Sequence, residues 1–273
     1  MNRNKLLRIA RNMYRIYSRR RIATAAAALS YFLTLSLFPL LICLYFMLGH
    51  LFPADRELLR FLDGLLPAET IRTILEYLRY VSSHRSSAML VMALSVLATS
   101  SSAAFRTVNR VMGEMRGVGR FPGFLSLPAS FLFSLVFLAS FYASALLLLT
   151  GKRFLEFADR HIMFMNISDR WQVWRFGLLF LLLFVLLCGL YRFTAPKGRP
   201  VRLLPGAALA SLALVAVSIL FSLFIGAGTR YPLIYGSLAS IILMMLWLYS
   251  CGVILFLGNA LNVSLEQIAD GRM

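Results

Sequence analysis

Long stretches of apolar residues without any charged side chain alternate along this chain with short segments in which charges cluster. Six such stretches occur, at 22–54, 86–105, 121–151, 176–191, 203–229 and 231–265. An ionised side chain at the centre of a bilayer costs at least about 2.5 kcal/mol, and a helix needs roughly 20 apolar residues to cross the hydrocarbon core. The pattern therefore predicts a bundle of about six membrane-spanning helices.

The predicted fold is all-α, a polytopic membrane helix bundle in which residues 1–273 form a single membrane domain. Five of the charge-free stretches are long enough to span a bilayer outright. The stretch at 176–191 has only 16 residues, but Arg175 and Arg192 can extend their apolar stems along it and keep their charges at the interface. The predicted spans are 27–50, 87–105, 124–149, 176–192, 203–225 and 236–260.

Composition supports a membrane protein. Of the 273 residues, 60% are hydrophobic and 14% are charged, whereas soluble domains average roughly 25% charged residues. The first apolar stretch is far longer than the roughly 7–15-residue core of a cleaved signal peptide, so we expect it to stay in the mature protein. Cys43, Cys188 and Cys251 all lie in predicted spans, which indicates apolar packing residues rather than a disulfide framework.

The distribution of Lys and Arg predicts the orientation. The N-terminal segment, 106–120, 192–202 and the C-terminal segment share one side of the predicted membrane and carry 17 basic and three acidic residues. The other side carries 11 basic and eight acidic residues. Because basic loops stay in the cytoplasm, both termini are predicted to be cytoplasmic. The formal net charge of +17 then indicates contact with anionic membrane lipids rather than with nucleic acid.

Four segments have further expected features. Residues 3–21 are predicted to form an amphipathic helix on the cytoplasmic surface, which either anchors the topology or senses anionic lipid. Residues 53–85 are expected to form short extracytoplasmic helices. Pro39 removes a backbone donor inside the first span and predicts a kink there. Residues 226–236 contain three Gly and one Pro and fit either a plain outer turn or a re-entrant segment.

Polar side chains gather at the cytoplasmic end of the second span. Arg106, Asn109 and Arg110 follow one another on adjoining helical turns, so we predict that they contact an anionic ligand or lipid head group. Asn259 and Asn262, near the cytoplasmic end of the sixth span, are interpreted as anchors. Four serines in the spans fit either a polar pathway or close helix packing. They are Ser30, Ser100, Ser134 and Ser240.

The chemistry that the sequence offers argues against an enzyme. Phosphoryl transfer needs a general base or metal-binding carboxylates near the RNA, but only three well-separated acids fall on the predicted cytoplasmic side. His50, His84 and His161 fall on the other side without the spacing of an HxxxH or HExxH metal motif. We therefore predict no catalytic residue, no metal site and no cofactor.

Four blocks of sequence resemble a known family. LSYFLTLSLFPL at 29–40, SSSAAFRTVNRVMG at 100–113, GRPVRLLPGAALAS at 198–211 and YGSLASIILMMLWLYS at 235–250 look like the blocks of the YihY/BrkB family, in the family's order. The resemblance implies a six-helix protein of the bacterial cytoplasmic membrane, from a family once labelled ribonuclease BN. It supplies no active-site motif that could be placed on this sequence.

Two functional classes follow from these features. The first is transport or translocation of a lipid-like or anionic small molecule across or along the cytoplasmic membrane. The alternative is a membrane scaffold that binds an envelope protein partner through 55–82, and a ribonuclease is disfavoured. The substrate, the energy source and the oligomeric state do not follow from the sequence.

Overall fold

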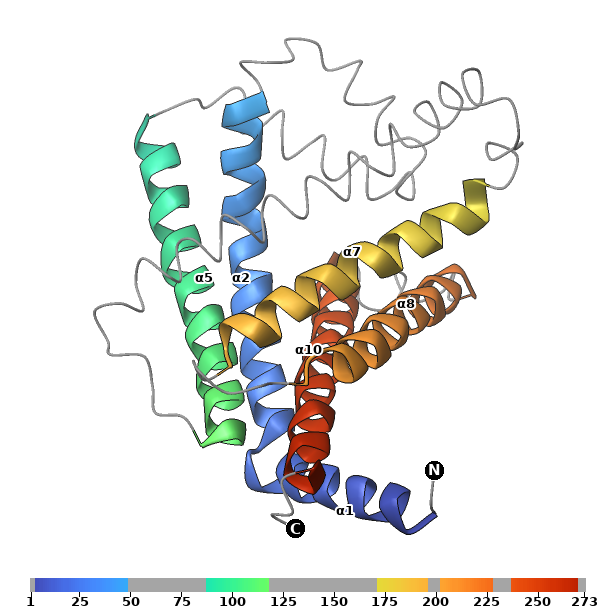
Figure 1. The fold of residues 1–273 in the computed structure, drawn as a ribbon. Helices are drawn as coiled ribbons and strands as arrows, with labels where there is room; N and C mark the ends of the chain where they lie inside the picture. Colours follow the sequence, from blue (N-terminus) through green and yellow to red (C-terminus); the bar gives the residue numbers. More distant parts are fainter. Residues whose placement is uncertain (1–2, 49–86, 118–170, 196–201, 228–236, 270–273) are drawn as a thin grey trace, which may run out of the picture. The chain divides into compact units, whose positions relative to one another are not determined.

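The computed structural model describes residues 3–48, 87–117, 171–195, 202–227 and 237–269 (Figure 1). Across these residues the regular secondary structure is α-helical, which confirms the predicted all-α class. The helices are α1 (Arg3–Arg19), α2 (Ile22–Leu48), α5 (Ser87–Arg116), α7 (Trp171–Phe193), α8 (Leu204–Ala227) and α10 (Ser237–Ala269). The predicted span at 124–149 and the segment 53–85 lie outside the described residues.

Four of the described helices contain a segment long and apolar enough to cross a membrane: Ile22–Leu40, Ser87–Arg116, Leu204–Phe221 and Ile241–Ala269. The apolar part of α7, Gly177–Phe193, is shorter. Large apolar side chains point outward from these helices, and Leu223 of α8 is 65% exposed. Such surfaces suit lipid contact, because apolar side chains have no hydrogen-bonding groups that hydrocarbon would leave unsatisfied.

Two helices run well past the ends of the predicted spans. The spans at 87–105 and 236–260 end where charged or polar residues begin, but α5 continues to Arg116 and α10 continues to Ala269. A charge marks the depth at which a helix leaves the hydrocarbon, whereas the backbone hydrogen bonds continue as long as the residues favour a helix. The extension of α5 carries Arg116, and the extension of α10 carries Asn262 and Glu266.

The described chain divides into two compact units, each of which contains parts of α2 and α5. The first unit comprises Met1–Thr34 and Ser102–Met273, and the second comprises Leu35–Ser101. The prediction of a single membrane domain is not tested by this division.

The core of the first unit combines small and large side chains from five helices. Ala26 of α2, Met112 of α5, Tyr191 of α7, Ala207 of α8 and Phe256 of α10 are all fully buried in it. Gly252 of α10 also faces α2, where an added Cβ would lie 3.2 Å from the Ala26 Cβ. Small residues allow helices in membranes to approach closely and gain van der Waals contact.

The closest helix crossing in this core joins α8 to α10, which lie against each other. A Cβ on Gly206 would overlap the carbonyl oxygen of Gly258, and a Cβ on Gly258 would come within 2.7 Å of the Ala210 Cβ. Both positions therefore need glycine so that the two backbones can touch. The crossing fixes the N-terminal turn of α8 beside the C-terminal third of α10.

The first helix joins the core at its junction with α2. Arg21 has a positive φ of 48°, and its amide donates to the Ser18 carbonyl at 3.3 Å, so the chain turns sharply between the two helices. Ile16 and Tyr17 pack against the core, and α1 contacts α10. The face of α1 that includes Ile16 thus rests on protein.

Within the second unit, the hydroxyl groups of α5 bond to their own helix. Ser95 donates to the Val91 carbonyl at 2.8 Å, and Thr99 donates to the Ser95 carbonyl at 2.9 Å. Such bonds to the preceding turn satisfy a hydroxyl group inside an apolar environment. Pro39 is buried within α2, and the kink expected there stays a prediction.

Candidate functional site: a buried arginine held by three helices

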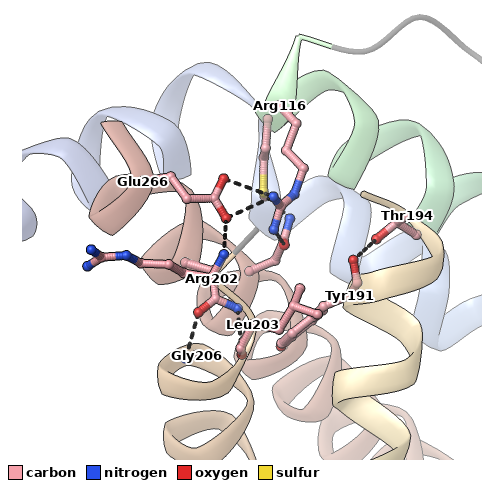
Figure 2. A network of polar contacts seen from close by, with 10 residues as sticks. Arg116, Tyr191, Thr194, Arg202, Leu203, Gly206 and Glu266 are labelled. Carbon is pink, nitrogen blue, oxygen red and sulfur yellow. Dashed lines mark hydrogen bonds and ion pairs between the residues drawn. The ribbon is translucent and has the colours of Figure 1, made fainter. Parts of the chain in front are cut away.

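The guanidinium group of Arg116, the last residue of α5, lies inside the first unit with 2% of its side chain exposed. Its Nη1 donates to both carboxylate oxygens of Glu266 from α10, at 3.0 and 2.9 Å. Its Nη2 donates to the Asn259 side-chain oxygen at 3.1 Å (Figure 2). A buried charge requires a partner of opposite sign and further hydrogen bonds, and α10 supplies both.

Glu266 has a second donor from the segment before α8. The backbone amide of Arg202 donates to Glu266 Oε1 at 2.9 Å, so this oxygen accepts bonds from two groups. Arg202 stands two residues before the start of α8, and the N-terminus of a helix carries partial positive charge. The carboxylate is therefore held between a guanidinium group and the positive end of a helix, while 21% of its side chain remains exposed.

Asn262 binds the beginning of α8 directly. Its side-chain oxygen accepts a bond from the Gly206 amide at 2.7 Å, and its side-chain nitrogen donates to the Leu203 carbonyl at 3.0 Å. The first amides of a helix have no partner within the helix, so a side chain from α10 acts here as a cap supplied from outside. The amide group is fully buried, and both of its ends are used.

Asn259 completes the contact with α5. Its side-chain nitrogen donates to the Met115 sulfur at 3.4 Å, while its oxygen faces Arg116. Because an amide oxygen accepts hydrogen bonds and an amide nitrogen donates them, the oxygen of Asn259 faces the Arg116 cation. Asn259, Asn262 and Glu266 thus form one polar stripe of α10 that faces α5 and the start of α8.

The helix α7 is hydrogen-bonded to the same region. The Tyr191 hydroxyl group donates to the Leu255 carbonyl of α10 at 2.8 Å, and Tyr191 is fully buried. The Thr194 hydroxyl group donates to the Leu190 carbonyl at 3.0 Å and lies 3.3 Å from the Met112 sulfur of α5. The helix α7 therefore contacts both α5 and α10 within the first unit.

The N-terminal helix is attached by one buried amide. Asn12 donates from its side-chain nitrogen to the Ser264 hydroxyl group at 3.2 Å and to the Gln267 side-chain oxygen at 2.7 Å. A second contact, between Arg20 and Glu114 at 3.9 Å, joins two side chains that are more than 40% exposed. Exposed pairs contribute little to stability, so we assign the attachment of α1 to Asn12 and to its packing on α10.

One donor in this network is unused. Among the residues that the structure describes, the buried Arg116 Nε has no hydrogen-bond partner. Glu266 places both oxygens on Nη1, whereas an arginine and a carboxylate commonly form two parallel bonds from two different nitrogens. The pair therefore leaves part of the donor capacity of the guanidinium group unsatisfied.

Comparison with known proteins identifies the family to which this bundle belongs. Residues 13–272 match the family described as Virulence factor BrkB, and the match covers all the elements described above except the start of α1. The chain is a member of the BrkB family. The resemblance seen in the four sequence blocks is therefore confirmed, and the apolar helices are those of an integral membrane protein.

This BrkB family member is also similar to a protein of Bacillus subtilis (strain 168) that is named as ribonuclease-like, YfkH. The two are 25% identical over 248 residues, which cover 89% of each chain. No solved structure matches this chain.

The residues that the sequence predicted as an anionic-ligand site lie on α5, before Arg116. Arg106 and Arg110 are exposed, and Asn109 is half-buried. They precede the buried arginine by two or three turns on the same helix. Their contact with an anionic group stays a prediction.

The four serines predicted to form a polar pathway or a close packing face are described only in part, and their role stays a prediction. The Ser30 hydroxyl group donates to the Ala27 carbonyl at 2.9 Å, and Ser30 belongs to the first unit. Ser100 donates to the Val96 carbonyl at 2.6 Å and belongs to the second unit. Ser134 lies outside the described residues, and Ser240 is in α10 at a position whose side chain is not described.

Sequence reasoning missed the residues that form the network. Arg116 and Glu266 were counted only as cytoplasmic charges, and the Asn pair was interpreted as an anchor. A signal was present, because Asn259, Asn262 and Glu266 recur at intervals of three and four residues and so share one face of a helix. A polar face that continues an apolar span predicts a buried partner.

The described residues hold no group of three or more His, Cys, Asp or Glu side chains arranged to bind a metal ion. The three histidines predicted to be isolated lie outside the described residues. Cys43, Cys188 and Cys251 are free thiols. The predicted absence of a metal site and of a cofactor remains a prediction for the whole chain.

Proposed function

We propose that this BrkB family member transports an anionic or lipid-like small molecule across or along the bacterial cytoplasmic membrane. The observation that carries the proposal is the buried ion pair between Arg116 and Glu266 at the point where α5, α8 and α10 meet. Ionised side chains inside membrane proteins are costly and commonly mark substrate pathways or moving parts.

The contact is an ion pair between helices, and this supports a moving part. Apolar side chains between packed helices exclude water as long as the helices stay together, whereas an ion pair can break when water enters and form again when water leaves. The Arg116 pair and the Arg202 amide bond together join α5, α10 and the start of α8 through one carboxylate. Breaking that carboxylate contact would loosen both junctions at once while the bonds of Asn259 and Asn262 remain, so the carboxylate can act as the movable part of a gate.

The orientation belongs to the same proposal. The charge distribution supports cytoplasmic termini, and the Arg116 network would then close the cytoplasmic end of the bundle. Exposed Arg106 and Arg110, with Asn109 beside them, would draw anionic lipid or an anionic substrate toward this end. In this scheme anionic membrane lipids are the partners, and nucleic acid is not.

A ribonuclease activity is less consistent with these contacts. The two acidic residues that the structure describes are both paired with arginine, Glu114 with Arg20 and Glu266 with Arg116. Both oxygens of Glu266 already accept from Arg116, so this carboxylate is poorly placed to take a proton from a substrate. We therefore propose a protein without enzymatic activity, although the relative YfkH is named as ribonuclease-like.

Reconstitution tests the proposal. The full chain is placed in liposomes that contain fluorescent phosphatidylglycerol, and dithionite bleaches the label that reaches the outer leaflet. A parallel set of vesicles is loaded with radiolabelled organic anions to measure efflux. We expect protein-dependent movement of lipid or anion that stops when Met115 and Asn259, which are in contact between α5 and α10, are replaced by cysteines and cross-linked in a background without the native cysteines. Movement should resume after reduction, because Arg116 and Glu266 are still present.

Two controls make the result decisive. The same cross-linker is applied to the parent background, where it should change nothing. Rates equal to those of protein-free vesicles for the lipid and for every anion would overturn the transport proposal. That outcome would favour the scaffold, which requires an intact bundle but no movement of solute.

A further inference from the structure

The surroundings of Glu266 have the composition of an anion-binding site. A guanidinium group contributes one nitrogen to both carboxylate oxygens, and a backbone amide just before the N-terminus of α8 donates to one of them. Arginine and the amides at the start of a helix are the groups that proteins use to bind phosphate and carboxylate groups of ligands. In this structure, the group that they bind belongs to the chain itself.

We infer that this site, formed by Arg116 and the Arg202 amide, binds the phosphate or carboxylate group of the transported molecule, and that Glu266 is a built-in occupant which the ligand displaces. The inference rests on the proposed function and specifies where its substrate is held. Phosphate and carboxylate share the required chemistry, which is a compact anion with at least two acceptor oxygens.

The unused donor supports a larger anion. Arg116 Nε is buried and has no partner among the described residues, while the side chain as a whole is 2% exposed. A carboxylate has two oxygens, and Glu266 has placed both on Nη1. The parallel donor pairs of a guanidinium group are Nη1 with Nη2 and Nε with Nη2. A phosphate group with three or more oxygens that binds the Nε and Nη2 pair would satisfy the donor that Glu266 leaves free.

The two partners differ in how easily they can move. Arg116 is held by Asn259 as well as by Glu266, and Asn259 is itself fully buried. Glu266 is partly exposed and stands three residues before the end of α10. The arginine is therefore the fixed element of the site, and the carboxylate is the element that can swing toward solvent.

Thermal unfolding of the purified full chain in detergent tests the inference. Glu266→Gln removes the resident charge, and Arg116→Gln with Glu266→Gln removes the anion site as well. Each protein is heated with sodium phosphate and with sodium chloride at the same ionic strength. A second series uses mixed micelles with phosphatidylglycerol or with phosphatidylcholine, which separates a lipid head group from a free anion.

We expect phosphate or phosphatidylglycerol to raise the Tm of the E266Q protein by several degrees, at concentrations at least about tenfold lower than the wild type needs. The double variant should respond no more to these anions than to chloride or phosphatidylcholine. Equal responses of the E266Q protein and the double variant, to both probes, would overturn the inference.

A second pair of variants covers the case in which E266Q does not fold. Glu266→Asp keeps the charge but shortens the side chain by one methylene, so the carboxylate reaches Arg116 less well. Its comparison with the Arg116→Gln, Glu266→Asp double variant has the same expected and contradicting results. Failure of this binding test together with measurable flux would overturn only the inference, whereas Arg116-dependent binding without any flux would overturn only the proposed function.

Discussion

Gly206 and Gly258 bring the backbones of α8 and α10 into contact, since a side chain on Gly206 would overlap the Gly258 carbonyl oxygen. This crossing holds the start of α8 against the polar stripe of α10. The Asn262 bond to the Gly206 amide depends on the same approach. The position of the anion site thus follows from two residues that have no side chain.

Replacing Gly206 with Ala should destabilise the protein by about 1–3 kcal/mol or more, because the added methyl group forces the helices apart. The matched control is Gly189→Ala in α7, where an added Cβ meets nothing within 4 Å. That control should be neutral or slightly stabilising, since Ala favours a helix over Gly by up to about 1 kcal/mol. Thermal unfolding in detergent measures both, and equal Tm values for the two variants would contradict the prediction.

Removing one partner of the buried ion pair should be more harmful than removing both. Arg116→Gln leaves Glu266 without its cation, and breaking a buried pair in this way costs about 3–5 kcal/mol. The double replacement of Arg116 and Glu266 by Met should recover most of that loss, because it leaves no unpaired charge. Chemical denaturation compares them, with Arg110→Gln at an exposed position as the control.

A finding that Arg116→Gln is as stable as Arg110→Gln would show that the guanidinium group is solvated in the membrane-bound protein. A double variant less stable than either single variant would show that Asn259 or the Arg202 amide depends on the pair for its own position.

Asn12→Ala should loosen α1 while the remaining helices stay folded. The substitution leaves the Ser264 and Gln267 side chains without their shared donor, and losing a buried hydrogen-bond partner costs about 1–3 kcal/mol. Hydrogen exchange in Arg3–Arg19 should become faster, with little change in α8. Tyr14→Ala is the control, since Tyr14 of the same helix is 74% exposed; similar exchange in both variants would contradict the prediction.

The amount of anionic lipid that the protein binds should depend on the exposed arginines of α5. Replacing Arg106 and Arg110 together with Gln should lower the amount of anionic lipid that native mass spectrometry detects on the purified protein, because two charges beside the inner leaflet are lost. Arg8 and Arg15 of α1 are also exposed, so their double replacement removes equal charge elsewhere. Unchanged lipid retention, or an equal loss from the α1 variant, would exclude a specific role for Arg106 and Arg110.

Cysteine labelling tests the orientation. Single cysteines at Arg110 and Arg202, both exposed, should react with a membrane-impermeant maleimide in inverted vesicles and not in intact cells. A cysteine at Asp159, which lies between the predicted spans 124–149 and 176–192 and so on the predicted outer side, should show the opposite pattern. Labelling of Arg110→Cys and Arg202→Cys from opposite sides would remove the basis for a cytoplasmic anion site.

The sequence predicted the all-α class and the four long apolar helices that the structure describes, because their signal is energetic and local. Each charge-free stretch reports that a segment avoids placing ions in hydrocarbon, and this is true whatever the segment packs against. The helix ends were predicted less well, since α5 and α10 continue past the predicted spans with polar side chains. The position of a charged residue indicates how deep that residue can lie in the bilayer. It does not indicate where the helical backbone ends.

The candidate site was not predictable in the same way. Arg116 and Glu266 are 150 residues apart, so their pairing depends on how α5 and α10 pack, which the periodicity of either helix alone does not reveal. The stripe of Asn259, Asn262 and Glu266 shows that α10 has a polar face, but the start of α8 as its partner follows from the Gly206 crossing. Sequence reasoning therefore favoured the exposed Arg106 and Arg110.

The long separation between Arg116 and Glu266 also affects how the protein is made. A ribosome synthesises the arginine 150 residues before the carboxylate that neutralises it, so α5 must enter the membrane with an unpaired cation at its end. Water, lipid phosphate or the insertion machinery has to solvate that cation until α10 arrives. A nascent chain that stalls before α10 lacks the carboxylate that pairs with this guanidinium group in the finished protein.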